Sequence, residues 1–229
     1  MDEGRTRQLV LYISGNKIFV YGEDFPATVQ MDVPTDAVRD FDVISLEKFA
    51  SAVGMFLVAN NIAGGVVTVV FSPEATFEKE FTDETQVKEG LSAFLDRVPF
   101  EEIAYQIYHI NKKIKVIAVN KEYCNVLKKI LNTERFLLYA LVPATLLQEA
   151  IPDLRSRIDL KIVLEKIDVA KQYNLFFQEE ATTVASSNSE KPGGKNRLFL
   201  LLGTFILLLI VFVVVIAMTR SPVQTKFGY

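Results

Sequence analysis

The residue types that most often perform catalysis are few in this chain and form no known catalytic pattern. His109 is the only histidine, and it lies in the run EIAYQIYHI, whose alternation is typical of a strand. Glu101 and Glu102 follow Pro99 in a loop-like stretch, where solvated charge is the ordinary interpretation of paired carboxylates. No Ser/His/Asp triad, HExxH, Walker-type or GxGxxG motif can be assembled. We therefore expect a protein that is not an enzyme and has no metal or cofactor.

One short segment could nevertheless contact a phosphate. Two apolar runs in LVLYISGNKIFVYG, Leu9–Gly22, meet at Ser14-Gly15-Asn16, a pattern that predicts a β-hairpin. A hairpin of this kind begins the phosphate site of some nucleotide-binding folds. The hairpin is therefore either a nucleotide site or a purely structural turn.

The remaining polar groups favour ordinary structural roles. Cys124 is the only cysteine and lies in an apolar stretch, so we expect a packing role without disulfides. The net charge of −3 and the lack of a basic stripe argue against nucleic-acid binding. Small basic groups occur at Lys112-Lys113-Lys115 and at Lys128-Lys129, where solvated charge is the main interpretation and contact with anionic lipid headgroups the alternative.

The C-terminal part carries the strongest single pattern in the sequence. Leu198 to Met218 contains no charged residue and would be about 31 Å long as a helix, which predicts a transmembrane segment. Residues 179–197 are rich in Ala, Thr, Ser, Gly, Pro and charge, which predicts a flexible linker, and 219–229 form a short outer tail. The first residues are polar and unlike a signal peptide, so we expect the N-terminal domain to be cytoplasmic.

Strands and helices alternate in the part before the linker, which predicts an α/β domain. We expect strands at Gln8–Ile13, Lys17–Tyr21, Ala27–Val33, Val66–Phe71, Ala75–Phe81, Ile103–Ile110, Ile114–Val119 and Phe136–Val142. We expect helices from Ser45 as cap to Asn60, at Asp83–Arg97, at Glu122–Leu131, and from Pro143 to Ala150. Leu154–Tyr173 is ambiguous, because its apolar residues fit one helix face whereas RIDLKIVL also fits a strand.

The order of these motifs resembles the actin-like cytoplasmic proteins of type IV pilus assembly (PilM) and type II secretion (GspL). The shared features are a buried strand ending at Ser72-Pro73, a Pro99-Phe100 segment followed by Glu102 and Tyr105 or Tyr108, a strand-to-helix junction from Val116 to Glu122, and a strand ending at Val142-Pro143. The resemblance implies the first lobe of an actin-like fold at 1–152, with an inserted small α/β subdomain at about 65–135.

The resemblance also bears on the hairpin. The family's phosphate-contacting hairpin has an acidic residue and a Gly-Ser/Thr-rich turn, whereas Tyr12 and the Ser14-Gly15-Asn16 turn stand at these positions here. A second half with its own Asp-x-Gly hairpin would be needed as well, and the chain reaches its predicted linker without one. We therefore expect a degenerate phosphate hairpin that is kept as structure, and no nucleotide.

A second motif lies just before the linker, in a helical extension expected at 153–178. Asn174-Leu175-Phe176-Phe177 is similar to the "N-L-L-P" segment that the pilus protein PilN carries ahead of its membrane span and inserts into PilM. The functional interpretation is a partner-binding peptide that occupies its own domain's groove or a neighbour's. The alternative is the amphipathic end of the last helix.

Together these features predict a non-catalytic, single-pass scaffold of the inner membrane that acts by protein–protein docking. Its expected partners are pilus or secretion platform subunits, the lipid bilayer through 198–218, and further copies of itself. Two alternatives stay open: a nucleotide-dependent switch completed by a partner chain, and a tail-anchored adaptor unrelated to pili.

Overall fold

The computed structural model describes residues 7–175. The predicted linker, transmembrane segment and outer tail, together with Phe176 and Phe177, lie outside the described residues. Within residues 7–175, no helix combines the length and the apolar character that crossing a bilayer requires.

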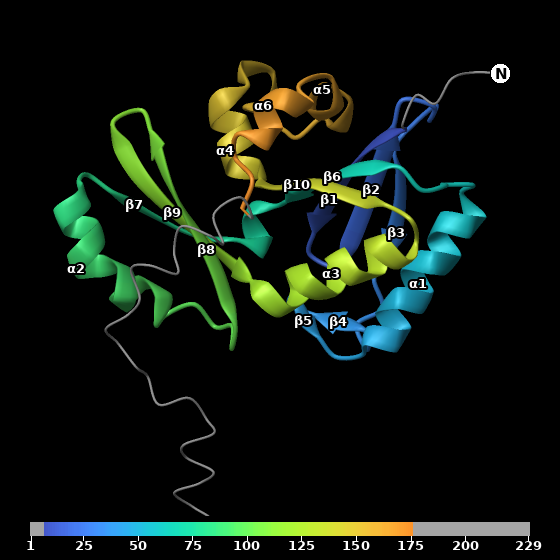
Figure 1. Ribbon diagram of the computed structural model, residues 1–229, viewed down its shortest axis with the longest axis horizontal. Coiled ribbons are helices and arrows are strands. Elements are labelled where there is room, and N and C mark those ends of the chain that lie inside the picture. Colours follow the sequence, from blue (N-terminus) through green and yellow to red (C-terminus); the bar gives the residue numbers. More distant parts are fainter. Residues whose placement is uncertain (1–6, 176–229) are drawn as a thin grey trace, which may run out of the picture. The chain divides into compact units, whose positions relative to one another are not determined.

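A five-stranded sheet with the order β10-β6-β1-β2-β3 forms the centre of the domain (Figure 1). Its strands are β1 (Gln8–Ser14), β2 (Lys17–Gly22), β3 (Val29–Asp32), β6 (Val66–Phe71) and β10 (Leu137–Pro143). The first three strands form an antiparallel meander, and β6 and β10 run parallel to β1. This arrangement leaves β3 and β10 as the two edges of the sheet.

Side chains of β1 alternate between two apolar layers, as the two-residue period of a strand requires. Leu9, Leu11 and Ile13 belong to one buried cluster and Val10 to a second, and each cluster includes residues of the helices that cover one face of the sheet. The run VVTVVF of β6 is buried on both faces, since Val67, Val69 and Phe71 belong to the first cluster and Val70 to the second.

The first face is covered by α1 (Leu46–Ala59) and α3 (Lys121–Thr133). Ser45 caps α1 as predicted, since its side chain accepts a hydrogen bond from the backbone N–H of Lys48. Tyr123 of α3 is buried among the rings of Phe41, Phe49 and Phe71, at centroid distances of 5.8–6.1 Å. This aromatic group fastens both helices to the sheet.

The opposite face is covered by α4 (Ala144–Ala150), the 3₁₀ turn η2 (Pro152–Leu154), α5 (Leu160–Glu165) and α6 (Ile167–Lys171). The ambiguous segment is thus helical, in two short pieces. Asp159 explains why the chain turns into a helix there, because its side chain accepts a hydrogen bond from the backbone N–H of Lys161 at 3.0 Å. α5 packs directly on β1 and β2.

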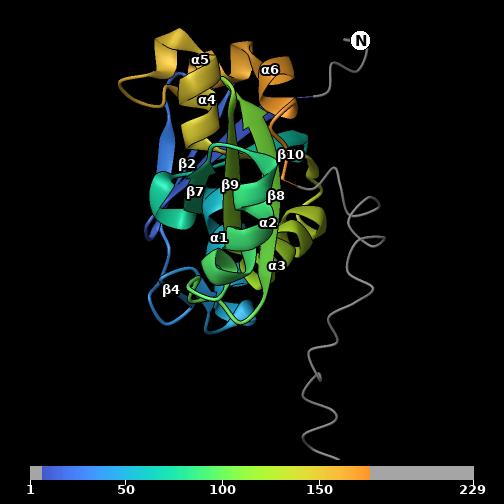
Figure 2. The same ribbon diagram turned by 90° about the vertical axis from the view of Figure 1, so that its left-hand side faces the viewer.

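A separate three-stranded antiparallel sheet, with the order β7-β9-β8, is inserted between β6 and α3. It consists of β7 (Phe77–Phe81), β8 (Ile103–Ile110) and β9 (Lys113–Asn120), preceded by the 3₁₀ turn η1 (Pro73–Ala75). Helix α2 (Glu84–Leu95) packs on one face of this sheet (Figure 2).

Two local features differ from the sequence expectation. The inserted sheet is narrower than the range of about 65–135, because β6 at one end and α3 at the other belong to the central sheet and its helical layer. The short strands β4 (Val38–Arg39) and β5 (Asp42–Val43) form a small antiparallel pair that the sequence pattern did not predict. Two-residue strands are too short to show an alternating pattern.

Candidate functional site

The segment Tyr173–Leu175, here called the docking segment, lies against the edge strand β10. The backbone N–H of Leu175 donates a hydrogen bond to the carbonyl oxygen of Leu141 at 2.9 Å. The backbone N–H of Leu141 in turn donates to the side-chain Oδ1 of Asn174 at 3.0 Å. Both backbone groups of this one residue of β10 are therefore paired by the docking segment.

This contact pairs backbone groups of β10 that would otherwise be unpaired at the edge of the sheet. An edge strand presents unpaired N–H and C=O groups, and a buried group that stays unpaired costs free energy. Here the amide oxygen of Asn174 accepts the hydrogen bond that a neighbouring strand's carbonyl would otherwise accept. The docking segment therefore adds to the sheet edge as a very short strand would, with a side chain supplying half of the pairing.

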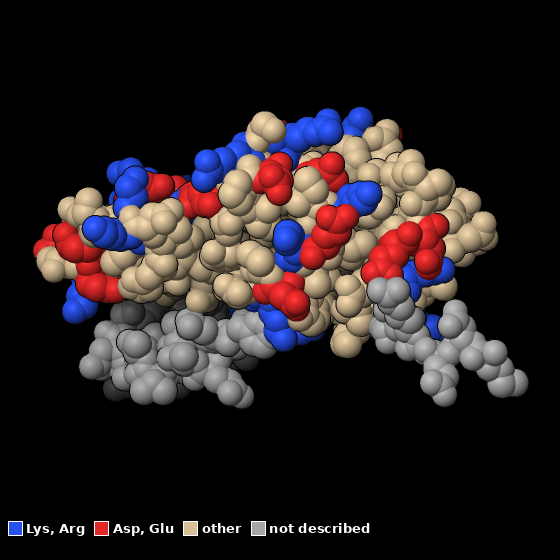
Figure 3. All heavy atoms as spheres, turned by 90° about the horizontal axis from the view of Figure 1, so that it is seen from above, with Lys and Arg blue, Asp and Glu red and all other residues tan. Residues whose placement is uncertain are grey.

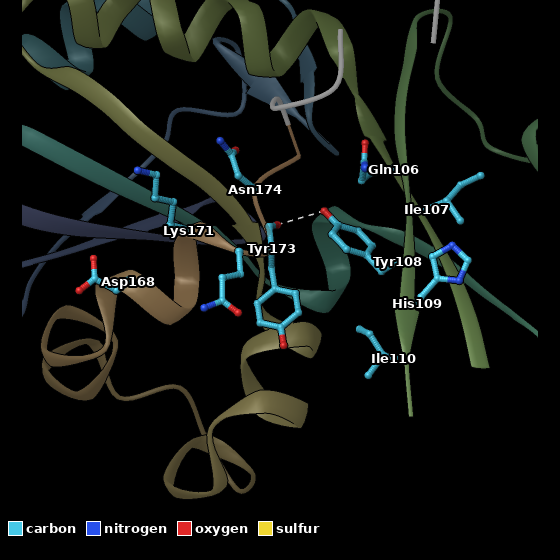
Figure 4. Close-up of a pocket in the computed structure, with 10 residues that line it drawn as sticks. Gln106, Ile107, Tyr108, His109, Ile110, Asp168, Lys171, Tyr173 and Asn174 are labelled. Carbon is cyan, nitrogen blue, oxygen red and sulfur yellow. Dashed lines mark hydrogen bonds between the residues drawn. The ribbon is translucent and has the colours of Figure 1, made fainter. Parts of the chain in front are cut away.

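Tyr108 of β8 holds the docking segment from the other side (Figure 4). Its hydroxyl donates a hydrogen bond to the carbonyl oxygen of Tyr173 at 3.0 Å, and the two rings lie 6.3 Å apart. Burial, and secondarily the nearby charge of Glu78, raises the pKa of Tyr108 above its usual value. The hydroxyl therefore stays protonated and remains a donor.

Apolar contacts complete the docking. The side chain of Leu175 is only 7% exposed and belongs to the same buried cluster as α1 and α3, and Tyr173 packs partly against both clusters. An open pocket of about 590 Å³ lies beside the docking segment, between β8 and α6. Its lining residues are Gln106–Ile110 on β8 and Asp168 with Lys171–Asn174 on the other side.

Of the predicted partner-binding residues, the structure brings Asn174 and Leu175 together in one site, and Phe176 and Phe177 lie outside the described residues. The site lies in the chain's own domain, between the edge strand β10 of the central sheet and strand β8 of the inserted sheet, and this space is here called the docking groove. Whether these residues also contact a partner stays a prediction.

The degenerate hairpin forms a tight two-residue turn. Ser14 pairs with Lys17 across it, and Gly15 adopts a positive φ of 55°, which an L residue with a Cβ seldom adopts. Glu74 of η1 reaches this turn, where its Oε2 accepts a hydrogen bond from the Ser14 hydroxyl at 3.4 Å. The backbone carbonyl oxygen of Asn16 accepts a hydrogen bond from the N–H of Val33, so Asn16 takes part in the meander. The turn thus has a carboxylate beside it.

Tyr12 lies on the sheet face that α5 covers. Its ring is 6.1 Å from that of Phe19, and burial raises the pKa of its hydroxyl. A small cavity of about 380 Å³ lies in front of this pair, lined by Tyr12, Phe19, Thr28 and residues 157–160. The hydroxyl is neutral at ordinary pH, so it does not supply the negative charge that the family's acidic residue carries.

The structure also shows the surroundings of the chain's histidine and cysteine. His109 is exposed, with its Nε2 3.6 Å from a carboxylate oxygen of Glu84. Cys124 is fully buried, and burial raises the pKa of its thiol, which keeps it protonated and unreactive. Within residues 7–175, no three His, Cys, Asp or Glu side chains gather in a manner suited to a metal ion.

The basic residues differ in how far they are exposed to solvent. On the face that carries α4, α5 and α6, Lys and Arg lie beside Asp and Glu, as expected for solvated charge (Figure 3). Lys115 is different, because only 7% of it is exposed. Sequence reasoning grouped it with its neighbours, and it missed Leu141 altogether. The sequence carried no signal for this burial, because Lys113 and Lys115 stand two residues apart on the same side of the strand, and a lysine that alternates with apolar residues predicts an exposed side.

No protein-family model matches the chain, and no curated protein matches it in sequence. Among solved structures, the chain is similar to the cytoplasmic domain of EpsL, an inner-membrane component of the type II secretion system of Vibrio cholerae. The identity is 11% and the TM-score 0.40, over 62% of this chain and 58% of that chain. It is also similar to a PilM–PilN type IV pilus biogenesis complex, at 13% identity and a TM-score of 0.46, over 66% and 52% of the two chains.

A third similar structure is a protein of unknown function with an actin-like ATPase fold from Bacteroides thetaiotaomicron, at 12% identity and a TM-score of 0.39. The match covers 69% of this chain and 60% of that chain. The chain thus spans 52–60% of the length of these three structures. Both families named from the sequence are among the matches, so the resemblance is confirmed, at low identity. Such a likeness concerns the fold and carries nothing about activity or partners.

Proposed function

We propose that this protein is a non-catalytic docking subunit of a membrane platform of the type IV pilus or type II secretion kind. The observation that carries the proposal is the docking segment, which pairs with Leu141 of an edge strand and with Tyr108 of the inserted sheet. Two structural parts meet at this segment, and each supplies a specific hydrogen bond. Such a site recognises a short peptide by hydrogen bonds to the peptide's backbone and to one amide side chain of the peptide.

The sequence resemblance supplies the biological context of the proposal. The "N-L-L-P" segment of PilN stands ahead of a membrane span, and the docking segment here also precedes a predicted span at 198–218. In this proposal the docking segment occupies its own groove when the protein is alone and an equivalent groove of another platform subunit in the assembly. The membrane anchor raises the local concentration of both.

The chemistry of the segment sets what it can bind. Leu175 needs an apolar pocket, and Asn174 needs a backbone N–H at the edge of a sheet. A partner of this kind has an unpaired parallel or antiparallel edge beside a buried apolar surface. We place the protein at the inner membrane with its N-terminal domain in the cytoplasm, where platform subunits with such domains assemble.

The test is a mild-detergent affinity purification of the tagged full-length protein from its native membrane, with the recovered proteins identified by mass spectrometry. Wild type should recover a pilus or secretion ATPase, a polytopic platform protein or a PilN-like subunit. Leu175→Asp should lose these proteins, because a carboxylate cannot enter the apolar pocket without a large desolvation cost.

Leu137→Asp is the matched control, because Leu137 lies on the same strand β10 but its side chain is 65% exposed. This variant should recover the same partners as wild type. Unchanged or increased recovery with Leu175→Asp would contradict the proposal. Recovery of unrelated membrane proteins by wild type would favour an adaptor outside pilus and secretion systems.

A further inference from the structure

A buried ammonium group joins the inserted sheet to the helical layer of the central sheet. Lys115 of β9 has its side chain only 9% exposed and forms an ion pair with Glu149 of α4. Its Nζ also lies 3.8 Å from Glu78 Oε2 and 3.7 Å from Glu80 Oε1, both on β7. One cation thus faces three carboxylates that come from two different parts of the domain.

The carboxylates have different further support. Glu80 is also paired with Lys113, whose Nζ lies 2.6 Å from Glu80 Oε2. Glu78 accepts hydrogen bonds from the hydroxyls of Thr76 and Thr145. Glu149 has Lys115 as its ion-pair partner among residues 7–175. The pair of Lys115 with Glu149 is therefore the ionic contact across the joint between β9 and α4.

Lys115 stands directly beside the residue that holds the docking segment. In the antiparallel pair of β8 and β9, Tyr108 lies opposite Lys115. Side chains at directly opposed positions project from the same face of a sheet, and both of these are buried. A chain of contacts therefore runs from Glu149 through Lys115 and Tyr108 to the carbonyl oxygen of Tyr173.

From this geometry we propose that Lys115 is the positioning residue of the docking groove. Its ammonium holds β9, and with it the paired strand β8, against α4, at the separation from which the Tyr108 hydroxyl reaches Tyr173. The inference deepens the proposed function, since it concerns what keeps the same groove shaped for its peptide.

Removal of the cation alone should open the groove. In Lys115→Met, the partly buried carboxylates of Glu78 and Glu149, whose side chains are 21% and 35% exposed, lose the cation that both contact, and their like charges repel each other across the joint. The joint relieves this by separating, which carries Tyr108 away from Tyr173. In Lys115→Met/Glu149→Gln the repulsion is absent, and Glu78 keeps its two hydroxyl donors. The double variant should therefore keep Tyr108 closer to Tyr173 than the single variant does.

The measurement is amide hydrogen exchange of the full chain in mild detergent, read at Leu175, whose N–H is bonded to Leu141. Lys115→Met should speed exchange at Leu175 by about tenfold or more, and Lys115→Met/Glu149→Gln should recover most of the protection. Lys113→Met is the matched control, because it lies two residues away on the same strand and is exposed. It should leave Leu175 unchanged.

Two outcomes would overturn the inference. Equal exchange at Leu175 in Lys115→Met and Lys113→Met would show that the cation does not shape the groove. Loss of protection throughout β1 and β6, in the double variant as well as in the single one, would show a general structural role. Neither outcome depends on a partner, so failure here is distinct from failure of the proposed function, which is read in the recovered proteins.

Discussion

The side-chain Oδ1 of Asn174 accepts the hydrogen bond of the Leu141 backbone N–H at 3.0 Å, so a side chain completes the edge of the central sheet. The same residue of β10 has its carbonyl oxygen bonded to the N–H of Leu175. An aliphatic side chain at position 174 could not accept the first bond. The asparagine of the predicted motif therefore has a physical role that depends on its amide oxygen.

Replacement of this amide should weaken docking. Asn174→Ala leaves the partly buried N–H of Leu141 without its acceptor, at a cost of about 1–3 kcal/mol. We expect faster exchange at the Leu141 and Leu175 amides and a lower free energy of unfolding in urea. Asn132→Ala, at an exposed position on α3, is the control and should change neither. Equal effects of the two substitutions would show that the Asn174 contact contributes nothing to docking.

Local sequence patterns were sufficient to predict most strands of the central sheet and the helices that cover it. The turn at Gly15 and Asn16, the cap at Ser45 and the apolar run of β6 are each determined by residues close in sequence, and the structure has all three. These features depend on short-range stereochemistry and on burial, which a sequence displays directly.

The site itself depends on long-range contacts, which a sequence does not display. Tyr108 and Tyr173 are 65 residues apart, and Lys115 and Glu149 are 34 apart. Nothing in the KKIK pattern distinguishes Lys115, which is buried among carboxylates, from its solvated neighbours, since Lys113 lies on the same side of the strand and is exposed. The motif Asn174-Leu175 could be named from the sequence, but the edge that it completes could not.

Stability should fall at alkaline pH because of two buried tyrosines. Burial raises the pKa of Tyr108 and of Tyr123 in the folded protein, whereas both titrate near pH 10 when unfolded. Above about pH 10 the unfolded state has therefore lost protons that the folded state retains, and each tyrosine lowers the free energy of unfolding by about 1.4 kcal/mol per pH unit. Below that pH their contribution is constant.

Tyr123→Phe provides the check on this dependence. It removes one titrating hydroxyl while the ring keeps its contacts with Phe49 and Phe71. Urea unfolding at several pH values between about 9 and 11 should give a shallower decline for the variant than for wild type. Identical declines would mean that Tyr123 ionises in the folded protein as easily as in the unfolded chain.

Replacement by alanine should destabilise the protein at Gly64 but not at Gly54. A Cβ on Gly64 would lie 2.4 Å from the backbone oxygen of Arg135, so Gly64→Ala forces a backbone shift and should cost about 1–3 kcal/mol. A Cβ on Gly54, inside α1, meets only the flexible side chain of Glu134 at 3.3 Å. Gly54→Ala should therefore be neutral or stabilise by about 0.5–1 kcal/mol, because alanine favours the helix. Urea unfolding of the two variants would reveal the difference, and equal shifts would contradict the steric argument.

The hairpin should not bind nucleotide. The Glu74 carboxylate lies 3.4 Å from the Ser14 hydroxyl, where it would repel a phosphate, and α5 covers the face of β1 that carries Tyr12. Calorimetry of the full chain with Mg-ATP should give no saturable heat, alone or with a recovered partner.

Glu74→Gln tests whether the Glu74 carboxylate is what prevents nucleotide binding. Binding by this variant would identify the carboxylate as the obstacle in a surviving phosphate turn, whereas no binding by either protein is expected if the turn serves the meander alone. Saturable heat with wild type and a partner would instead support a switch whose second half comes from that partner.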